Sequence, residues 1–402
     1  MNIGYVIFCE SIFDAILKTQ VINLLKQMSK KSNHRFSIYW FCPIKNYITR
    51  RNEIINLTEE LSEFNIKLKV VPIVYLTRWF NVKIVHIPLV YQMLIPLIYF
   101  IKKDKIDVFH VRSYPGAIPF TLLKRAFNKV NFILDTRSDF VEENSLFHWK
   151  NNRVTINYWM KKEKKLYETS DKIIAISENF ANQKLADFKS KTYIIPNNVT
   201  LDNNKLDLEF RNEFRKEKNL VGKIVYCYLG SLGNGWNQLE TYMKFFKENK
   251  QLMTNFHFLL LTPKVNKIQN ELKNYDISES NYTVKSVPNN EVVKYLTVAD
   301  FGLQFMTHKD SRIGIKVVEY LTAGLPVIVN ENVGGAASII NKNSLGIVLN
   351  NETLPESELT NIINNYNETS SKCKTFAKEN FSTEVVASKY LDVYQSIIKE
   401  VN

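Results

Sequence analysis

The residues best suited to bind a ligand lie between positions 311 and 329. Gly314 stands where a helix would begin, and the free N–H groups of a first helical turn can hold a phosphate. Lys316 adds a positive charge, and Glu319 falls on the same helix face three residues later. A carboxylate beside a phosphate site suits the two hydroxyls of a ribose, so the pattern indicates a nucleotide site. The alternative is a surface ion pair on an ordinary helix.

A glycine-rich turn, Gly230-Ser231-Leu232-Gly233-Asn234-Gly235, follows a predicted strand and precedes a predicted helix. Backbone N–H groups in such a turn could also hold a phosphate. The dinucleotide fingerprint would need glycine where Gln238 stands, and a P-loop would need lysine and a hydroxyl residue where Trp236 and Asn237 stand. NAD-dependent and ATP-hydrolysing enzymes are therefore disfavoured, and a plain connecting turn remains the alternative.

A second polar group follows two predicted strands of the first half of the chain. Asp135 and Arg137 come directly after one strand, and His110 and Arg112 end the strand before it. Loops at the carboxyl ends of parallel strands face the ligand in an open sheet. Asp135 could act as a base or orient an acceptor hydroxyl, and Arg137 could neutralise phosphate charge. A structural ion pair between these two residues is the alternative.

Metal and disulfide chemistry are not indicated by the sequence. The six histidines show no metal-ligand spacing, and the four cysteines lie far apart without a C-x-x-C pair. We therefore expect no metal and a reducing cytoplasmic setting. The opening residues lack the basic flank of a secretory signal, since Lys18 is the first basic residue.

The positive charge of the chain lies in its first half. Residues 1–198 hold 30 Lys and Arg against 17 Asp and Glu, whereas residues 199–402 hold 23 of each, so the first half carries the net charge of +13. An anionic membrane surface and nucleic acid would both attract such a half. The alternative is an ordinary basic surface in contact with solvent.

Two stretches of the first half could meet a membrane. Residues 84–101 are apolar and about long enough to span, but His86, Gln92 and two prolines favour a helix buried in a domain or lying at the interface. Residues 153–165 place aromatic and apolar side chains beside lysines, a combination suited to lipid headgroups. These side chains are Tyr158, Trp159, Met160, Lys161, Lys162, Lys164 and Lys165.

The elements that position these residues follow from the length and pattern of the chain. The 402 residues are 45% hydrophobic and 23% charged, which is typical of a soluble globular protein of two domains. Apolar runs alternate with helical patterns in both halves, as in stacked βαβ units. We expect two doubly wound α/β domains, residues 1–198 and 223–380, facing a cleft and joined by a linker region at 199–222.

Several motifs of the chain resemble those of a known protein family. Residues 311–329 closely resemble the nucleotide-sugar signature of group 1 glycosyltransferases, in the form S-x-x-x-x-K-x-x-E-Y-L-x-x-G-x-P-V-I common in the bacterial surface-polysaccharide branch. Residues 170–177, 194–199 and 226–233 resemble further motifs in the order of the family. The resemblance implies the GT-B fold of two Rossmann-like domains, with a C-terminal helix, residues 381–402, packing back toward the first domain.

Carried over residue by residue, the resemblance implies a donor site. Glu319 would bind the ribose hydroxyls, Lys316 and the first glycine turn would hold the diphosphate, and Val287 would meet the base. The chain departs from the family at Ser311, where the family has the first Glu of a pair that touches the donor sugar, so sugar and stereochemistry stay open. The implied donor-binding residues are Gly230, Ser231, Gly233, Val287, Arg312, Gly314, Lys316 and Glu319.

The expected function is transfer of a sugar from a nucleotide sugar to a hydroxyl of a lipid-linked or growing glycan. The expected donor is a UDP-sugar. The setting would be capsule, O-antigen or lipopolysaccharide biosynthesis on the inner face of the cell membrane, with retention of configuration and without metal or cofactor. Asp135 and Arg137 would be catalytic, and His110 and Arg112 would line the acceptor side. A nucleotide-sugar 2-epimerase of the same fold and a non-catalytic nucleotide-sugar-binding relative are the alternatives. A nucleic-acid-binding protein is disfavoured because no such motif is present.

Overall fold

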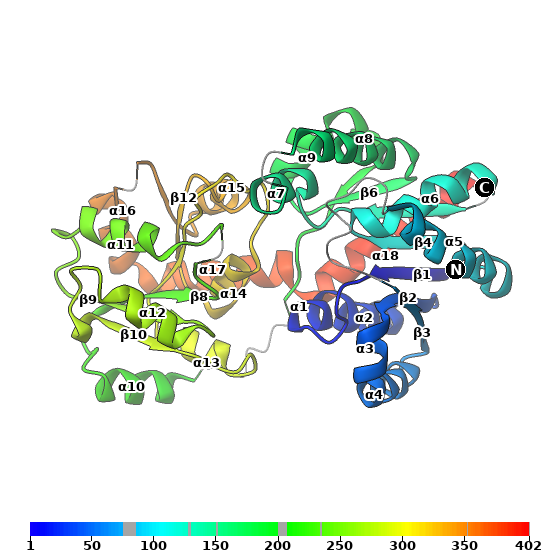
Figure 1. Cartoon of the computed structure of the whole chain (residues 1–402). Helices are drawn as coiled ribbons and strands as arrows, with labels where there is room; N and C mark the ends of the chain where they lie inside the picture. Colours follow the sequence, from blue (N-terminus) through cyan, green and yellow to red (C-terminus); the bar gives the residue numbers. More distant parts are fainter. Residues whose placement is uncertain are drawn as a thin grey trace. The chain divides into compact units, whose positions relative to one another are not determined.

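The computed structural model describes residues 1–74, 86–127, 130–149, 152–199, 207–233, 235–351 and 353–401. The chain divides into two compact units. Residues 1–196 and 383–402 form the first unit, and residues 197–382 form the second. Each unit is built on one parallel sheet with helices packed against it (Figure 1). The expected α/β fold of two Rossmann-like sheets is therefore confirmed.

The sheet of the first unit has seven parallel strands in the order β3-β2-β1-β4-β5-β6-β7. Its central strands are mostly apolar and almost entirely buried, as expected for strands covered on both faces. The strand order changes direction between β1 and β4, and ligands bind at the carboxyl ends of strands beside such a switch point. The strands are β1 (Asn2–Phe8), β2 (Arg35–Pro43), β3 (Ile66–Ile73), β4 (Val108–Arg112), β5 (Asn131–Asp135), β6 (Lys172–Ala175) and β7 (Thr192–Ile194).

The helices of the first unit include one from the end of the chain. Helix α18 (Thr383–Val401) packs against α2 (Leu24–Lys31), and its buried Tyr390 and Tyr394 join the apolar core beneath β1 and β2. The expected return of the C-terminal helix is confirmed. The other helices are α1 (Ala15–Leu17), a π-helix (Lys18–Asn23), α3 (Ile44–Thr49), α4 (Arg51–Ser62), α5 (His86–Asp104), α6 (Tyr114–Ala126), α7 (Phe140–Phe147), α8 (Arg153–Thr169), α9 (Glu178–Lys184) and a 3₁₀ helix (Ala186–Lys191).

The sheet of the second unit has six parallel strands in the order β10-β9-β8-β11-β12-β13, so its switch point lies between β8 and β11. The strands are β8 (Ile224–Leu229), β9 (Phe256–Leu261), β10 (Tyr282–Lys285), β11 (Phe301–Gln304), β12 (Val327–Asn330) and β13 (Gly346–Leu349). The helices are α10 (Leu208–Glu217), α11 (Leu239–Glu248), α12 (Val265–Leu272), a 3₁₀ helix (Glu279–Asn281), α13 (Val292–Leu296), α14 (Ile315–Ala323), α15 (Gly334–Asn343), α16 (Glu356–Asn364) and α17 (Tyr366–Phe381).

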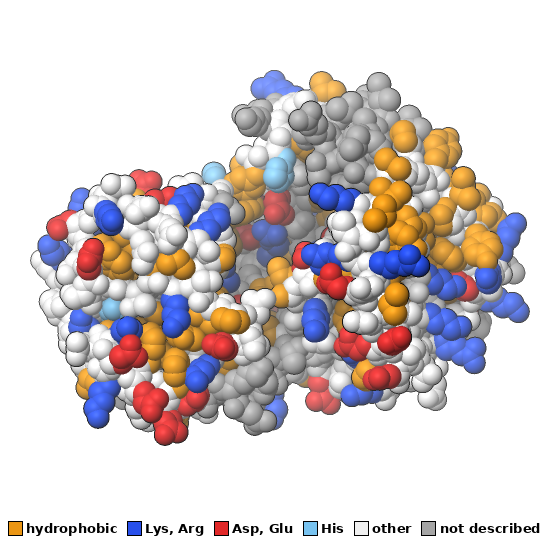
Figure 2. Space-filling model, turned by 60° about the horizontal axis from the view of Figure 1, so that its bottom comes forward, with side chains coloured by type: hydrophobic (Ala, Val, Ile, Leu, Met, Phe, Trp, Pro, Cys, Tyr) orange, Lys and Arg blue, Asp and Glu red, His pale blue; other side chains and the backbone are white. Residues whose placement is uncertain are grey.

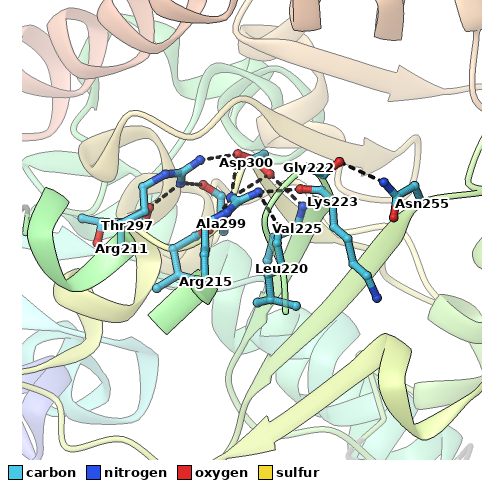
Figure 3. A network of polar contacts seen from close by, with 11 residues as sticks. Arg211, Arg215, Leu220, Gly222, Lys223, Val225, Asn255, Thr297, Ala299 and Asp300 are labelled. Carbon is cyan, nitrogen blue, oxygen red and sulfur yellow. Dashed lines mark hydrogen bonds and ion pairs between the residues drawn. The ribbon is translucent and has the colours of Figure 1, made fainter. Parts of the chain in front are cut away.

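Helix α10 is held on the second unit by a network of polar contacts around Asp300 (Figure 3). Arg211 donates to Asp300 Oδ1 at 2.6 Å, and Arg215 bonds both oxygens of the same carboxylate at 3.2 and 3.1 Å. The backbone N–H of Val225, in β8, donates to Asp300 Oδ2 at 2.8 Å. The region 199–222, expected as a linker, therefore contains a helix that is anchored to the sheet of the second unit.

Helix α5 contains most of the apolar stretch 84–101; its first two residues lie outside the described part. One face of the helix is buried and another is exposed, because Met93 and Leu97 are buried whereas Ile95 is 73% exposed. Among the described residues, no helix combines the length and apolar character needed to cross a membrane.

Candidate functional site

Lys316 lies against Gly230 in the second unit. Gly230 follows β8, and Lys316 stands in the first turn of α14, which comes after β11. A Cβ atom on Gly230 would lie 2.4 Å from Lys316 Cε, and the φ of Gly230 is +124°. Glycine is required on both counts, the close approach and the backbone angle. The contact places a positive side chain at the switch point of the sheet, where parallel sheets bind their ligands.

Two N–H groups of the glycine turn are already bonded within the protein. Gly230 donates to the carbonyl of Leu261 at 2.8 Å, and Gly233 donates to the carbonyl of Asn237 at 2.8 Å. We expected the turn to hold phosphate through its backbone, but these two donors hold the turn itself in place. Ser231 lies between them, and its carbonyl accepts from the Tyr228 hydroxyl.

Glu319 and Lys316 form an electrostatic pair on one face of α14. Burial raises the pKa of Glu319 to about 7, and the charge of Lys316 partly offsets that rise. Burial lowers the pKa of Lys316 to about 8, and Glu319 partly offsets that fall. Both charges are therefore incompletely compensated by the protein. Ligand hydroxyls that donate to the carboxylate and ligand phosphate oxygens that face the ammonium would favour both charged forms.

The start of α14 opens onto free space. Gly314 is the N-cap residue of the helix, with φ −64° and ψ 142°, which other residues also adopt. A Cβ atom added to it would meet nothing within 4 Å. The N-terminus of α14 thus has room for a ligand group beside the N–H donors and the positive end of the helix dipole.

The loop before α14 is fixed by its own side chains. Arg312 Nε donates to both oxygens of Asp310, at 2.8 and 3.1 Å, and its guanidinium lies 5.4 Å from the centre of the Trp236 ring. Ser311 is 8% exposed, and its carbonyl packs so closely on Gly335 that a Cβ atom there would lie 2.2 Å from the oxygen. Arg312 therefore has a defined position next to the Lys316 site.

Two positioning residues of the second unit were missed by the sequence reasoning. The hydroxyl of Tyr320 accepts from the N–H of Leu229 at 2.7 Å and donates to the carbonyl of Leu303 at 3.2 Å, so it ties β8 to β11 at the switch point. The side-chain amide of Asn330 bonds both the N–H and the carbonyl of Met306, at 3.1 and 2.9 Å. Tyr320 could have been identified from the sequence, because it directly follows Glu319 in the motif. The sequence around Asn330 contains no comparable signal.

Val287, expected to meet a base, lies in the loop after β10. It is partly buried and packs against the apolar core of the second unit. That loop follows the carboxyl end of an edge strand, so Val287 belongs to the same edge of the sheet as Gly230.

Asp135 of the first unit is fully buried at the end of β5. Its Oδ2 accepts from the Tyr390 hydroxyl at 3.3 Å and lies 3.1 Å from His110 Nε2 and 3.3 Å from Arg137 Nε. Burial acts to raise the pKa of Asp135, but Arg137 and His110 together hold it below its ordinary value. A carboxylate so enclosed and ionised is placed to orient its neighbours.

His110 is also fully buried, and both of its ring nitrogens have partners. Nδ1 lies 2.7 Å from the Tyr394 hydroxyl. Burial lowers the pKa of His110, so the ring is neutral near pH 7. The sequence placed His110 on the acceptor side; in the structure its ring has no exposed surface and packs between Tyr5 of β1 and Tyr390 of α18.

Arg112 ends β4, and its side chain is 5% exposed. Its Nε donates to Glu10 Oε2 at 2.9 Å, and its Nη2 donates to Gln20 Oε1 at 3.1 Å. Arg137 follows β5, with a side chain 7% exposed. The four residues predicted in the first unit thus lie together at the carboxyl ends of β4 and β5, as the strand pairing requires.

Trp159 of α8 does not face outward, unlike the prediction for this helix. Trp159 is 1% exposed and stacks on Trp149, with ring centres 6.1 Å apart and planes inclined by 12°. The expectation that Trp159 anchors a membrane contact is therefore wrong, because the residue fills a small aromatic core with Phe140. Met160, by contrast, is 53% exposed.

Helix α5 carries an exposed apolar stripe. Tyr91, Ile95 and Tyr99 recur every four residues and are 61%, 73% and 53% exposed. Lys102 and Lys103 follow at the end of the helix. Figure 2 shows hydrophobic side chains beside basic ones on the part of the surface that belongs to the first unit.

No metal centre is found among the residues that the structure describes: no three His, Cys, Asp or Glu side chains gather there in a way that could hold an ion. The four cysteines are free thiols.

Comparison with known proteins places these features in a family. The sequence model for "Glycosyl transferases group 1" matches residues 209–380, and the model for "Glycosyltransferase Family 4" matches residues 18–203. Between them the two matches cover the second unit and most of the first. Among curated proteins, none matches the chain.

Solved structures share the fold over almost the whole chain. HepE of Anabaena in complex with UDP is 13% identical with a TM-score of 0.67, covering 98% of this chain and 100% of its own. A glycosyltransferase of Rickettsia africae is 16% identical with a TM-score of 0.67, covering 99% and 98%. WaaG, a glycosyltransferase involved in lipopolysaccharide biosynthesis, is 14% identical with a TM-score of 0.61, covering 97% and 99%.

Two parallel Rossmann-like sheets, with a C-terminal helix that returns to the first, define the GT-B fold. With the two family matches, they make this protein a glycosyltransferase that uses a nucleotide-sugar donor. It belongs to the group 1 glycosyltransferases.

Proposed function

We propose that the second unit binds a UDP-sugar and that the first unit presents the hydroxyl of a lipid-linked or growing glycan in surface-polysaccharide biosynthesis. The observation that carries the donor side is the placement of Lys316 on Gly230, with Glu319 one turn along α14. An ammonium, a helix N-terminus and a carboxylate then meet the diphosphate and the ribose of one ligand. HepE of Anabaena has been solved with UDP, which agrees with this choice of donor.

The remaining donor-site roles follow the same placement. Arg312 and the open helix start at Gly314 would face the diphosphate, and Val287 would lie against the base. Ser231 and Gly233 would shape the turn beneath the phosphates, since the Gly233 N–H is held by the backbone. As the bond between the anomeric carbon and the phosphate oxygen breaks, negative charge grows on the departing diphosphate. Lys316 and the α14 N-terminus stabilise that charge without a metal or cofactor.

The acceptor side belongs to the first unit in this proposal. The acceptor hydroxyl forms the new bond to the anomeric carbon and gives its proton to the departing phosphate oxygen, and configuration at that carbon is retained. Arg137 and Arg112 would bind the acceptor, whereas the buried Asp135 and His110 would hold Arg137 in place. This assigns Asp135 to positioning rather than to proton transfer.

The acceptor is proposed to reside on an anionic membrane at the cytoplasmic face. Two observations support this placement: the charge of +13 on residues 1–198 and the apolar stripe of α5 that ends in Lys102 and Lys103. Apolar and basic side chains on one helix face suit the headgroup region of a bilayer.

A donor screen tests the proposal. Purified protein is incubated with a panel of nucleotide sugars and a bacterial membrane extract, and released nucleotide is measured. The proposal predicts UDP release that requires both one UDP-sugar and the extract. Release without extract, together with deuterium uptake from heavy water at C2 of the sugar, would instead establish a 2-epimerase. Release from no donor with any extract would contradict the proposed transfer.

A further inference from the structure

Three neighbouring strands of the first unit end in an unusual backbone conformation. Cys9 after β1, Ser113 after β4 and Arg137 after β5 have φ values of +57°, +68° and +55°. Non-glycine residues seldom adopt such angles, and they cluster at ligand sites, where surrounding contacts hold them. The three residues follow the carboxyl ends of adjacent strands in the sheet, so the strained segments lie at one edge. That edge is the part of an open parallel sheet that binds ligands.

Buried donors without acceptors gather at this edge. Arg137 Nη1 and Nη2, Arg112 Nη1 and the Tyr5 hydroxyl are enclosed and have no hydrogen-bond partner among the described residues. The groups share neighbours: the Tyr5 ring lies 4.4 Å from the ring of His110, and His110 and Arg137 both contact Asp135, the register partner of Arg112. Buried guanidinium groups are ordinarily hydrogen-bonded throughout, so an acceptor from outside the chain is expected.

The carboxylates of the cluster do not supply that acceptor. Glu10 is taken up by Arg112 Nε, and Asp135 Oδ2 is shared by Tyr390, His110 and Arg137. Asp135 Oδ1 has no partner among the described residues and could accept from a hydroxyl. Arg112 is held through Nε and Nη2, which leaves Nη1 unused, whereas the contact of Arg137 with Asp135 is an ion pair through Nε.

We propose that Arg112 and Arg137 form a binding site for a phosphoryl group of the acceptor. Three guanidinium nitrogens and one hydroxyl offer several donors at one edge of the sheet, which matches the oxygens of a tetrahedral anion better than the two of a carboxylate. The ligand class is a phosphate or diphosphate ester. This inference rests on the proposed function for the statement that the ester belongs to the acceptor; the anion site itself does not depend on it.

Arg137 stands in the loop after β5. The side chain of Arg137 is 93% buried, but the residue as a whole and its neighbour Ser138 are only partly buried, so the guanidinium lies just beneath an accessible loop. The N-cap bond from Glu142 N–H to Asp139 then turns the chain into α7.

Equilibrium dialysis with radiolabelled inorganic pyrophosphate tests the site on the full chain. Saturating UDP is added so that the second unit cannot contribute. We expect one equivalent of pyrophosphate that UDP does not displace, and at least tenfold weaker binding of acetate. Pyrophosphate binding that UDP abolishes, or acetate binding as tight as that of pyrophosphate, would overturn the proposal.

Variants assign the binding to the two arginines. Arg137→Gln and Arg112→Gln should each weaken UDP-independent pyrophosphate binding at least tenfold, and Arg137→Lys should restore part of it by returning the charge without the planar fork. Arg125→Gln, at an exposed arginine of α6, is the matched control and should bind like the parent. Parent-like binding in both site variants would overturn the assignment. If either variant fails to fold, the dialysis of the parent still decides the matter.

Inhibition kinetics then identify the source of the phosphoryl group. In the transfer assay, pyrophosphate should compete with the membrane-extract acceptor and not with the UDP-sugar. Competition with the donor alone would overturn the acceptor assignment. A parent that binds pyrophosphate beside UDP but transfers no sugar would count against the proposed function and leave the anion site standing.

Discussion

The side chain of Lys316 fills the space that a Cβ atom on Gly230 would need: the built Cβ lies 2.4 Å from Lys316 Cε and 3.2 Å from Nζ. Gly230 thus allows this contact because it has no Cβ atom. The contact joins the end of β8 to the first turn of α14, and it directs the Lys316 ammonium along the side of the turn. Single substitutions can therefore separate the effect of this contact on ligand binding from the effect of a side chain at positive φ.

Gly230→Ala should displace Lys316 and weaken UDP binding at least tenfold, measured by calorimetry. Gly222→Ala is the matched control, because Gly222 also has positive φ, at +79°, but a Cβ atom there would meet nothing within 4 Å. Both substitutions put a Cβ atom at positive φ, which strains the backbone by at least about 1–2 kcal/mol. Gly230→Ala adds the clash with Lys316, so it should lower stability more than Gly222→Ala does. Equal UDP affinity in the two variants would show that the Lys316 contact has no part in binding.

Glu319→Gln should weaken UDP binding by about 10- to 150-fold, since losing a hydrogen bond to a charged group costs about 1.5–3 kcal/mol. The fold should persist, because burial already opposes the charge of this carboxyl. Calorimetry on Glu358→Gln, an exposed glutamate of α16, gives the control and should match the parent. Unchanged UDP affinity in Glu319→Gln would remove the carboxylate from the ribose site.

UDP affinity should fall as the pH rises through about 8, because Lys316 loses its proton there and the diphosphate prefers the ammonium. The loss should approach about tenfold per pH unit above that value. Lys316→Ala should bind weakly and show no such fall between pH 7 and 9. A parent affinity that stays constant over this range would mean that Lys316 does not meet the phosphates.

The same group affects stability with a defined sign. Its pKa in the folded protein, about 8, lies below the ordinary value of 10.5, so the unfolded chain binds the proton more strongly between these values. The contribution of Lys316 to folding is therefore least favourable below pH 8 and improves as the pH rises toward 10.5. In urea titrations of the ligand-free protein, Lys316→Ala should remove this rise.

Vesicle binding should depend on α5. Replacing Tyr91, Ile95 and Tyr99 by Ser should strongly reduce sedimentation with vesicles that contain anionic lipid, because the exposed stripe supplies the apolar contact. Added salt should weaken parent binding, since attraction to such a surface is worth roughly 1 kcal/mol per nearby Lys or Arg and is screened within a Debye length.

The comparison variant for this measurement lies on α8. This variant changes Lys161, Lys162, Lys164 and Lys165 to Gln. It removes charge from a helix whose Trp159 is buried, so it should lose less vesicle binding than the α5 variant does. Equal binding of the α5 variant and the parent would exclude α5 as the docking surface. Equal binding of neutral and anionic vesicles at low salt would exclude the electrostatic part of the account.

The sequence predicted the two sheets because apolar runs and helical patterns report burial directly. It also placed Lys316 and Glu319 on one helix face, since that follows from a spacing of three residues. It could not show that Asp135 is enclosed, because the enclosing Tyr390 lies 255 residues away on a helix that returns to the first unit.

Side-chain direction was the other limit. The pattern around Trp159 offered no sign that Trp149 and Phe140 would cover it, because aromatic residues beside lysines occur both in cores and at lipid surfaces. The polar stretch 199–222 likewise concealed α10, whose attachment depends on the two arginines that reach Asp300, far along the chain.

The central claim is that Lys316 holds the diphosphate of a bound nucleotide. Calorimetric titration of the parent and of Lys316→Ala with UDP and with uridine tests it most directly. We predict that the parent binds one UDP and that Lys316→Ala weakens UDP binding at least tenfold while changing uridine binding much less. A parent that binds no UDP, or a variant that loses UDP and uridine affinity equally, would contradict the account.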